Sequence, residues 1–344
     1  MGGTQNAMVN LANGLVIAGL KVEMYALFQL EHFFKLDNRV VFSESPKPPH
    51  CYNVITRMIA ILANVRKIIK KSESQTIIVY GKFYSALTLL ASFGLKKRIF
   101  ISDRASPLYK DPLYVELITK IIYFFIKPAG IIAQTNTSAT CQRKRFGNNV
   151  PIQVIPNPVR EIKHYNYAKE KTVLAVGRFG DKLKGFDLLI EAWGKIDAPD
   201  WKLVFAGGFE CDDPVLGERA KALKVYDTIV FSGKVNDLDE LYARSSIFVI
   251  PSRSEGFPNA LAEAMSAGLA CVSFDFIAGP RDMIKEGYNG YLVPNGNVDA
   301  LAEKIQYVIE NENERKIFSQ NATGMKDVLS MERIIRQFIN FISI

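Results

Sequence analysis

The stretch that decides the fold is residues 252–275, which read SRSEGFPNALAEAMSAGLACVSFD. An apolar run at 247–251 precedes it and predicts a buried strand, and a second apolar run closes the stretch as the next strand. Between the two runs a helix is expected from Pro258, because proline suits a first helical turn whose N–H groups lack partners. The stretch therefore predicts a βαβ unit with two carboxylates, Glu255 and Glu263, near the positive end of a helix.

The same alternation of strands and helices extends over the whole chain. In the second half, strands are expected at 172–176, 202–206, 228–231, 247–250, 270–274 and 290–293. Helices are expected at 186–196, 214–223, 237–243, 258–267, 280–285, 298–310 and 331–342. The first half predicts strands at 21–28, 40–41, 76–80, 96–101, 130–134 and 153–155, with helices at 7–18 and 54–71. This spacing predicts an α/β fold in which helices cover both faces of parallel sheets.

The length of 344 residues favours two domains, and two prolines mark the boundary between them. Pro156 and Pro158 stiffen an extended segment and stop helix formation on either side. We expect domains at 1–157 and 158–325, with a C-terminal helix at 326–344 that packs back on the first domain. Because Gly2 and Gly3 open a helix with no strand before them, the sheet of the first domain is expected to lack one strand beside Gly2.

The positive charge of the chain is concentrated in its first half. Residues 1–158 hold 20 Lys and Arg against 8 Asp and Glu, whereas the remainder holds 23 against 27. An anionic partner is therefore expected for the first half alone, and nucleic acid, anionic lipid or a phosphorylated substrate would each fit. The basic amphipathic helix at 54–71 fits a membrane surface or a phosphate, and equally well a packed helix with a solvated rim. Its cations of interest are Arg57, Arg66, Lys67 and Lys70.

Cysteine and histidine usage points to a cytosolic protein without a histidine-based metal site. The four cysteines are scattered without a C-x-x-C pair, which is typical of a reducing compartment. The three histidines are isolated from one another. The most apolar stretch, 113–133, is interrupted by charges and by Pro128, so no membrane-spanning helix is expected.

Cations and glycines follow the strands of the second half at the ends where open α/β sheets bind ligands. Gly177 and Arg178 follow one strand, and Lys184 opens the next helix, which together predict a cradle for a diphosphate. Gly208 follows the second strand, and the backbone near Val235, after the third, could meet a nucleotide base.

In combination and order, these phrases resemble the retaining glycosyltransferases of family 4. The matching phrases are GRF with KGFDLLIEA, FAGG, FSGKV, the 252–275 stretch, AGPRDMI and GYLVP, with weaker matches GGT, ISDRASP and VIPNPV in the first half. The resemblance implies the GT-B fold, in which two Rossmann-like domains face a central cleft. It also implies an enzyme of the type that synthesises bacterial surface polysaccharides.

The resemblance also implies a role for each matching residue. Glu255 would contact the donor sugar, Glu263 the ribose, and Arg178 with Lys184 the diphosphate. The donor-binding positions are Gly3, Gly177, Gly208, Val235, Gly256, Phe257, Pro258, Asn259, Ala260 and Glu263. Asp103 falls near the attacking hydroxyl and is the fourth catalytic candidate, with Arg104 beside it on the acceptor side.

The leading hypothesis is a retaining, metal-independent hexosyltransferase that is peripherally associated with the cytoplasmic face of the inner membrane. It would transfer a hexose or N-acetylhexosamine from a UDP sugar to a glycan on a polyprenyl diphosphate, with no cofactor and no nucleic-acid partner. A sugar-nucleotide epimerase or phosphorylase, and a non-catalytic nucleotide-sugar-binding protein, are the alternatives on the same fold.

Overall fold

The computed structural model describes residues 3–28, 35–45 and 54–343. By its internal contacts the chain divides into two compact units. Unit 1 consists of Met1–Pro158 and Met331–Ile344, and unit 2 consists of Val159–Ser330. Each unit has its own parallel sheet layer and its own core, so each is described by itself.

Unit 2 is built on a six-stranded parallel sheet. Its strands are β7 (Thr172–Val176), β8 (Lys202–Ala206), β9 (Ile229–Phe231), β10 (Ile247–Ile250), β11 (Ala270–Asp275) and β12 (Gly290–Pro294). All six strands that the sequence predicts are present, three of them with the same ends. The strand order is β12-β11-β10-β7-β8-β9, so the chain runs outward in one direction from β7 and in the other direction from β10. The topological switch point, where such sheets bind ligands, therefore lies between β7 and β10.

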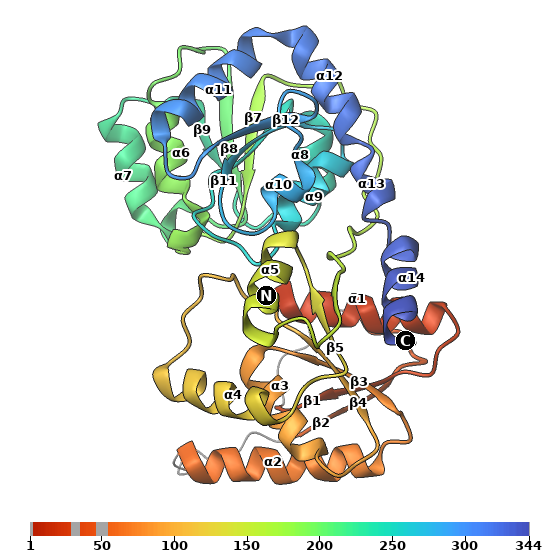
Figure 1. Cartoon of the computed structure of the whole chain (residues 1–344). Helices are drawn as coiled ribbons and strands as arrows, with labels where there is room; N and C mark the ends of the chain where they lie inside the picture. The colour runs from red at the N-terminus through yellow and green to blue at the C-terminus, as the bar shows by residue number, and fades with distance from the viewer. Residues whose placement is uncertain (1–2, 29–34, 46–53, 344) are drawn as a thin grey trace. The chain divides into compact units, whose positions relative to one another are not determined.

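Helices cover both faces of this sheet (Figure 1). On one face α6 (Phe186–Trp193) packs against α7 (Pro214–Ala222) and α11 (Val298–Glu310). On the other, α9 (Asn259–Ser266) packs against α12 (Glu312–Ala322) and α13 (Met325–Val328). The remaining helices are α8 (Leu238–Arg244), α10 (Pro280–Met283) and the 3₁₀ turns η1 (Lys182–Lys184), η2 (Glu210–Asp212) and η3 (Tyr226–Thr228). Because the sheet is covered on both sides, β10 is buried along its whole length.

The described strands of unit 1 form two separate parallel sheets. One pairs β1 (Glu23–Ala26) with β2 (Val41–Glu44). The other has the order β3 (Thr76–Tyr80), β4 (Arg98–Ser102), β5 (Gly130–Ala133) and β6 (Ile152–Val154). The sequence predicted each of these strands to within a few residues. The strand expected to be missing beside Gly2 concerns a position outside the described residues.

In the described part of unit 1, six helices pack against these sheets: α1 (Gly3–Ile17), α2 (Val54–Lys71), α3 (Lys82–Ser92), α4 (Leu113–Phe125), α5 (Asn136–Phe146) and α14 (Met331–Ile342). Ile99 and Ile101 of β4 face a core shared with α3 and α4. Phe100 points to the opposite face, as alternation along a strand requires, and its ring lies 5.5 Å from that of Phe341 in α14. The C-terminal helix therefore belongs to the core of unit 1.

The helix α4 carries an apolar face that is not covered within unit 1. Its inner side is buried through Val115, Thr119, Ile122 and Tyr123. We call its outer side the α4 ridge; it consists of Leu113, Leu117, Ile121, Phe124 and Phe125, which are 51% to 85% exposed. Among the described residues, no helix combines the length and the apolarity that a membrane crossing requires.

Candidate active site

Lys184 and Glu255 meet at the switch point of the unit 2 sheet. Lys184 ends η1, in the loop after β7, and Glu255 lies in the loop after β10. Lys184 Nζ donates to Glu255 Oε1 at 2.7 Å, and Ser252 Oγ donates to the same oxygen at 2.8 Å. Both side chains remain partly open to solvent, at 24% and 15% exposure. A cation and an oriented carboxylate thus share the position where a ligand would enter.

Arg253 links the segment after β7 to the loop after β10. Its guanidinium makes two hydrogen bonds to the Asp187 carboxylate, at 2.8 and 2.7 Å, and donates to the Lys182 carbonyl at 2.7 Å. These bonds lower the pKa of Asp187. Paired Arg–carboxylate contacts of this kind fix geometry as well as contribute energy. The sequence phrases contain both residues, but Arg253 and Asp187 are 66 positions apart, and no local pattern predicts their contact.

Gly185 lets the two loops approach each other. Its φ of 67° is in the left-handed region, and a Cβ there would lie 2.0 Å from the Pro251 carbonyl oxygen. Only glycine satisfies both conditions. Gly177, which the sequence analysis assigned to the donor, is overlaid by the Lys184 side chain, whose Cδ would lie 3.2 Å from an added Cβ.

Arg178 does not share the Lys184–Glu255 contact. Its side chain is 69% exposed and pairs with Asp181 three residues away, at 3.1 Å. An exposed pair of this kind contributes little to stability. Arg178 is therefore held loosely near the loop and can turn toward an anion at small cost.

The loops after β8 and β9 are joined through their backbones. Gly207 N–H donates to the Gly233 carbonyl at 2.8 Å, and Gly208 forms an isolated bridge with Gly233. The space beside Gly208 is occupied by the Phe179 ring, 2.5 Å from where a Cβ would lie. Val235 follows in the same loop and is half-buried. Gly208 thus has a packing role that the sequence analysis did not foresee.

The turn between Glu255 and α9 differs slightly from expectation. Pro258 is the N-cap of α9 rather than its first helical residue, and α9 begins at Asn259. The amide of Asn259, expected to be bare, donates to the Phe257 carbonyl at 3.0 Å. Phe257 and Pro258 are buried, whereas Gly256 and Ala260 are partly exposed.

Glu263 sits in a polar cluster that the sequence did not predict. Glu263 Oε2 accepts from Arg160 at 3.3 Å and from the Tyr242 hydroxyl at 3.4 Å. Arg160 also binds the buried Asp239 through two hydrogen bonds. Burial raises the pKa of Glu263, and the Arg160 charge opposes that rise. Arg160 lies two residues after Pro158 of the proline linker, and no other feature of the sequence marked it.

Asp103 and Arg104 follow β4 in unit 1 and line a pocket of about 430 Å³. Burial raises the pKa of Asp103, whose Oδ1 accepts from the Ala105 amide at 3.3 Å. The Arg104 guanidinium lies 4.9 Å from the centre of the Tyr80 ring and donates to Asn157. Gly3 is the first described residue of α1, so the structure places it at a helix start.

The four α2 cations named from the sequence differ in their contacts. Arg66 donates to the carbonyls of Ala91 and Phe93, at 2.6 and 3.0 Å, and so closes the C-terminal end of α3. The Arg57 guanidinium lies 5.7 Å from the centre of the Phe28 ring. Lys67 and Lys70 are exposed. Arg66 therefore has a structural role that the amphipathic pattern did not reveal.

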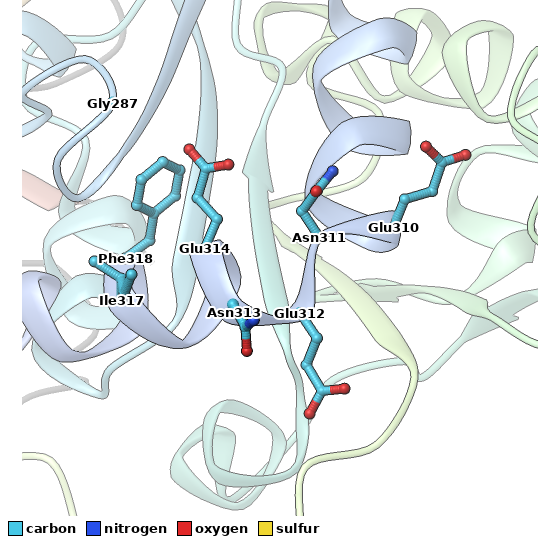
Figure 2. Close-up of a pocket in the computed structure, with 8 residues that line it drawn as sticks. All are labelled: Gly287, Glu310, Asn311, Glu312, Asn313, Glu314, Ile317 and Phe318. Carbon is cyan, nitrogen blue, oxygen red and sulfur yellow. The ribbon is translucent and has the colours of Figure 1, made fainter.

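A larger hollow of unit 2, about 670 Å³, is formed by residues around the start of α12 (Figure 2). It includes Gly287, which precedes β12, so it lies at the amino edge of the sheet, opposite the loop of Glu255. Glu312 and Glu314 point to different sides of the ribbon there, and each has a protein partner, Lys316 and Tyr291. A hollow rich in carboxylates repels a diphosphate, so the switch point is the better ligand site.

Known proteins are similar to this chain in both sequence and fold. The family model described as "Glycosyl transferases group 1" matches residues 160–325. An uncharacterized glycosyltransferase of Haemophilus influenzae is 26% identical over 98% of this chain and 95% of its own length. A Campylobacter jejuni enzyme is 25% identical over 99% of this chain and 95% of its own length. It is named an α-1,4-N-acetyl-D-galactosaminyltransferase of GalNAc-α-(1→4)-GalNAc-α-(1→3)-diNAcBac-PP-undecaprenol.

Two solved structures superpose on the chain with a TM-score of 0.82. The lipopolysaccharide outer core galactosyltransferase WaaB, in its apo form, is 21% identical over 100% of this chain and 96% of its own. HepE of Anabaena, in complex with UDP, is 17% identical over 99% of this chain and 96% of its own. The chain is therefore a glycosyltransferase with the GT-B fold. Residues 160–325, nearly all of unit 2, belong to the group 1 glycosyltransferases, as the resemblance of the sequence phrases had indicated.

Proposed function

We propose that this glycosyltransferase transfers a hexose or N-acetylhexosamine from a UDP sugar to a glycan on a polyprenyl diphosphate, with retention of the anomeric configuration. The single observation that carries the proposal is the pairing of Lys184 with Glu255 at the switch point of unit 2. A cation is needed there for the leaving diphosphate, and a carboxylate is needed for the sugar hydroxyls.

The donor is proposed to bind along the strand-end loops of unit 2. Lys184 and Arg178 take the diphosphate, Glu255 takes the sugar hydroxyls, and Glu263 takes the ribose. The backbone of Gly177, Gly208 and Gly256–Ala260 lines the donor, and the base lies against the loop of Val235. The donor phosphate then competes with Glu255 for Lys184, while Ser252 continues to hold the Glu255 carboxylate.

The chemistry proposed needs no metal and no cofactor. Cleavage of the sugar–diphosphate bond leaves a nucleotide dianion, and fixed cations placed where that charge develops stabilise it directly. Retention follows if the acceptor hydroxyl attacks from the face that the leaving phosphate occupies, with the phosphate oxygen taking the proton. Asp103 of unit 1 is the protein group proposed to orient that hydroxyl, because its partly buried carboxyl lines the pocket after β4 and has a raised pKa.

Unit 1 is proposed to bind the acceptor and the membrane. Two Campylobacter jejuni relatives carry names that specify undecaprenol-diphosphate glycans as substrates, which supports a lipid-linked acceptor. The α4 ridge offers exposed apolar side chains, and Lys67 and Lys70 of α2 are exposed cations. Exposed apolar side chains and exposed cations are both features of surfaces that bind anionic lipid. We propose peripheral association with the inner face of the membrane on this ground.

A panel of UDP, GDP and ADP sugars tests the donor assignment. A selective UDP sugar is expected to raise the melting temperature, because a ligand well above its dissociation constant stabilises by a few kcal/mol. Transfer to a synthetic polyprenyl-diphosphate disaccharide then gives a product whose anomeric NMR coupling reports retention, with and without EDTA. Nucleotide binding without a transferred sugar would instead support the epimerase or the non-catalytic alternative.

A further inference from the structure

Phe209 is a large apolar side chain that is open to solvent at the carboxyl edge of the unit 2 sheet. It lies in the loop after β8, directly before η2, and is 50% exposed. By contrast, the nearby rings of Phe179, Phe186 and Phe205 are buried and pack against one another. Single exposed apolar side chains are common on protein surfaces, so what distinguishes Phe209 is how its ring is held.

The ring of Phe209 lies on the backbone of Gly233, in the loop after β9. A Cβ built on Gly233 would lie 2.7 Å from Phe209 Cδ1 and Cζ and nearer still to Cε1, so any other residue there would displace the ring. The φ of Gly233 is 70°, in the left-handed region, which also favours glycine. The backbone under the ring is hydrogen-bonded in turn, because the Gly207 N–H donates to the Gly233 carbonyl at 2.8 Å.

The backbone of Phe209 is held by Asp212. The Phe209 N–H donates to Asp212 Oδ2 at 2.7 Å, and the Asp212 N–H donates to the Phe209 carbonyl at 2.9 Å. These two bonds fix the direction in which the side chain leaves the chain. The ring is thus an exposed apolar surface that is already ordered, and a ligand that covers it loses little entropy in ordering it.

A series of contacts joins Phe209 to Lys184. The Lys184 side chain lies over Gly177, and a Cβ on Gly207 would collide with the Gly177 carbonyl oxygen. Gly207 is bonded to Gly233, on which the Phe209 ring lies. In the strand order β10-β7-β8-β9, the loop after β9 is two strand spacings, about 10 Å, from the loop after β7. A nucleoside attached to a diphosphate at Lys184 can span that distance.

We infer that the Phe209 ring stacks on the nucleobase of the sugar nucleotide. The inference rests on the proposed function, which assigns the diphosphate to Lys184 and the base to the loop of Val235, two residues after Gly233. The sugar is assigned to Glu255, after β10 on the other side of β7, so the base is the part of the donor near Phe209.

Stacking is a contact that suits an exposed aromatic ring, because every base has a flat π surface of its own. Phe209 therefore contributes affinity for a base, while the backbone near Val235 is left to distinguish one base from another. The family resemblance did not mark this residue, since the matching phrase FAGG ends at Gly208.

The dihydrouracil analogue of UDP separates stacking from hydrogen bonding. It keeps the ring N–H and both carbonyl groups of uracil but loses the planar π system. By titration calorimetry, the wild type is expected to bind UDP about tenfold more tightly than dihydro-UDP, and Phe209→Leu should bind the two about equally. Tyr288→Leu is the matched control, because Tyr288 is 51% exposed and precedes β12, and it should keep the wild-type ratio.

Phe209→Trp gives a second readout that needs no turnover. Trp193 and Trp201 are buried, at 3% and 6% exposure, so the introduced indole is the exposed fluorophore. UDP is expected to quench its fluorescence by stacking, and dihydro-UDP should quench it less. The variant should also keep the preference for UDP over dihydro-UDP, because indole stacks as a phenyl ring does.

The outcomes separate this inference from the proposed function. A UDP to dihydro-UDP ratio that Phe209→Leu leaves unchanged, or Phe209→Trp fluorescence that no nucleotide alters, would overturn the stacking role while nucleotide binding persists. Quenching by GDP or ADP but not by UDP would support stacking and overturn the UDP donor. A protein that binds none of these nucleotides would overturn the proposed function and this inference with it.

Discussion

Lys184 Nζ donates to Glu255 Oε1 at 2.7 Å, so the cation and the carboxylate proposed for the two halves of the donor are paired with each other. The same Glu255 oxygen accepts from Ser252, which fixes its direction before any ligand arrives. A donor phosphate that draws Lys184 away leaves Ser252 to hold the carboxylate in place. The two hydrogen bonds therefore order the Glu255 side chain.

Glu255→Ala is expected to lower kcat by about 100-fold or more, because a charge-assisted contact in the transition state is lost. The melting-temperature shift caused by UDP should remain, since UDP lacks the sugar. Steady-state kinetics and thermal shift measure the two effects. Glu191→Ala removes a glutamate from another ion pair of unit 2, with Arg219, and should leave kcat near the wild-type value. Turnover that Glu255→Ala leaves intact would refute its role.

Arg160 is expected to set the pH dependence of donor binding through Glu263. Burial raises the pKa of Glu263 and Arg160 lowers it, so Arg160→Met should raise that pKa further. If the ionised carboxylate binds the ribose, the acid limb of kcat/KM for the donor moves to higher pH. Arg160→Lys keeps the charge and should move the limb less.

The same shift fixes the sign of a stability effect. The raised pKa means that the folded chain binds more protons at Glu263 than the unfolded chain does, from the ordinary value of 4.5 upward. The stability due to this group therefore falls as pH rises through that interval. Urea unfolding at several pH values compares wild type with Glu263→Gln: the unfolding free energy of the wild type minus that of the variant should fall as pH rises, and a difference that does not change with pH would contradict the assignment.

Gly185→Ala is expected to destabilise unit 2 and weaken donor binding. The left-handed φ of 67° and the contact of 2.0 Å with the Pro251 carbonyl together cost more than either alone, about 3 kcal/mol or more. Gly287→Ala is the matched control, because Gly287 has a φ of 69° with nothing within 4 Å. Its loss of stability therefore measures the cost of the left-handed backbone alone, about 1 kcal/mol. Equal losses in the two variants would mean that the approach of the loops does not matter.

The α4 ridge is expected to bind anionic vesicles. Replacing Leu117 and Phe124 with glutamine should reduce the fraction bound to phosphatidylglycerol vesicles about tenfold or more, because burial of each large apolar side chain contributes roughly 1.5–3 kcal/mol. Val215 and Ile317 of unit 2 are similarly exposed, and the same pair of replacements there is the control. Vesicle sedimentation of both double variants settles which surface is used.

The α2 cations should separate into a structural and a lipid-binding group. Arg66→Ala is expected to lower the free energy of unfolding by about 1–2 kcal/mol, because the carbonyls of Ala91 and Phe93 lose their donor. Lys67→Gln with Lys70→Gln should leave stability unchanged and weaken vesicle binding, most visibly at low salt. A stable Arg66→Ala variant would contradict the capping role.

The sequence was most informative where apolar runs are bounded by glycine. The strands of unit 2 and the helix at 54–71 were predicted closely, because a buried strand or an amphipathic face leaves a local pattern. The helix α5 was not expected, since its sequence, NTSATCQRKRF, has almost no apolar periodicity. Its start depends on Thr135, whose side chain accepts from the Ser138 amide.

The candidate site was predictable in its residues but not in its contacts. Parallel strands end at one edge of a sheet, so the meeting of Lys184 and Glu255 could be expected in outline. The choice of partner could not, because Arg178 turns to Asp181 and Arg160 reaches Asp239, 79 positions away. Such pairings depend on the distance between loops, which a pattern of residue types does not contain.

The hydrogen bond from the Val159 amide to the Leu329 carbonyl, 2.9 Å long, joins the two ends of unit 2. A domain whose two ends lie close together can be inserted into another domain, and it can be exchanged for a similar domain without distorting the rest of the chain. Residues 159–330 are thus a natural graft for building chimeric glycosyltransferases. Donor preference would travel with the graft, and acceptor preference would stay with the host.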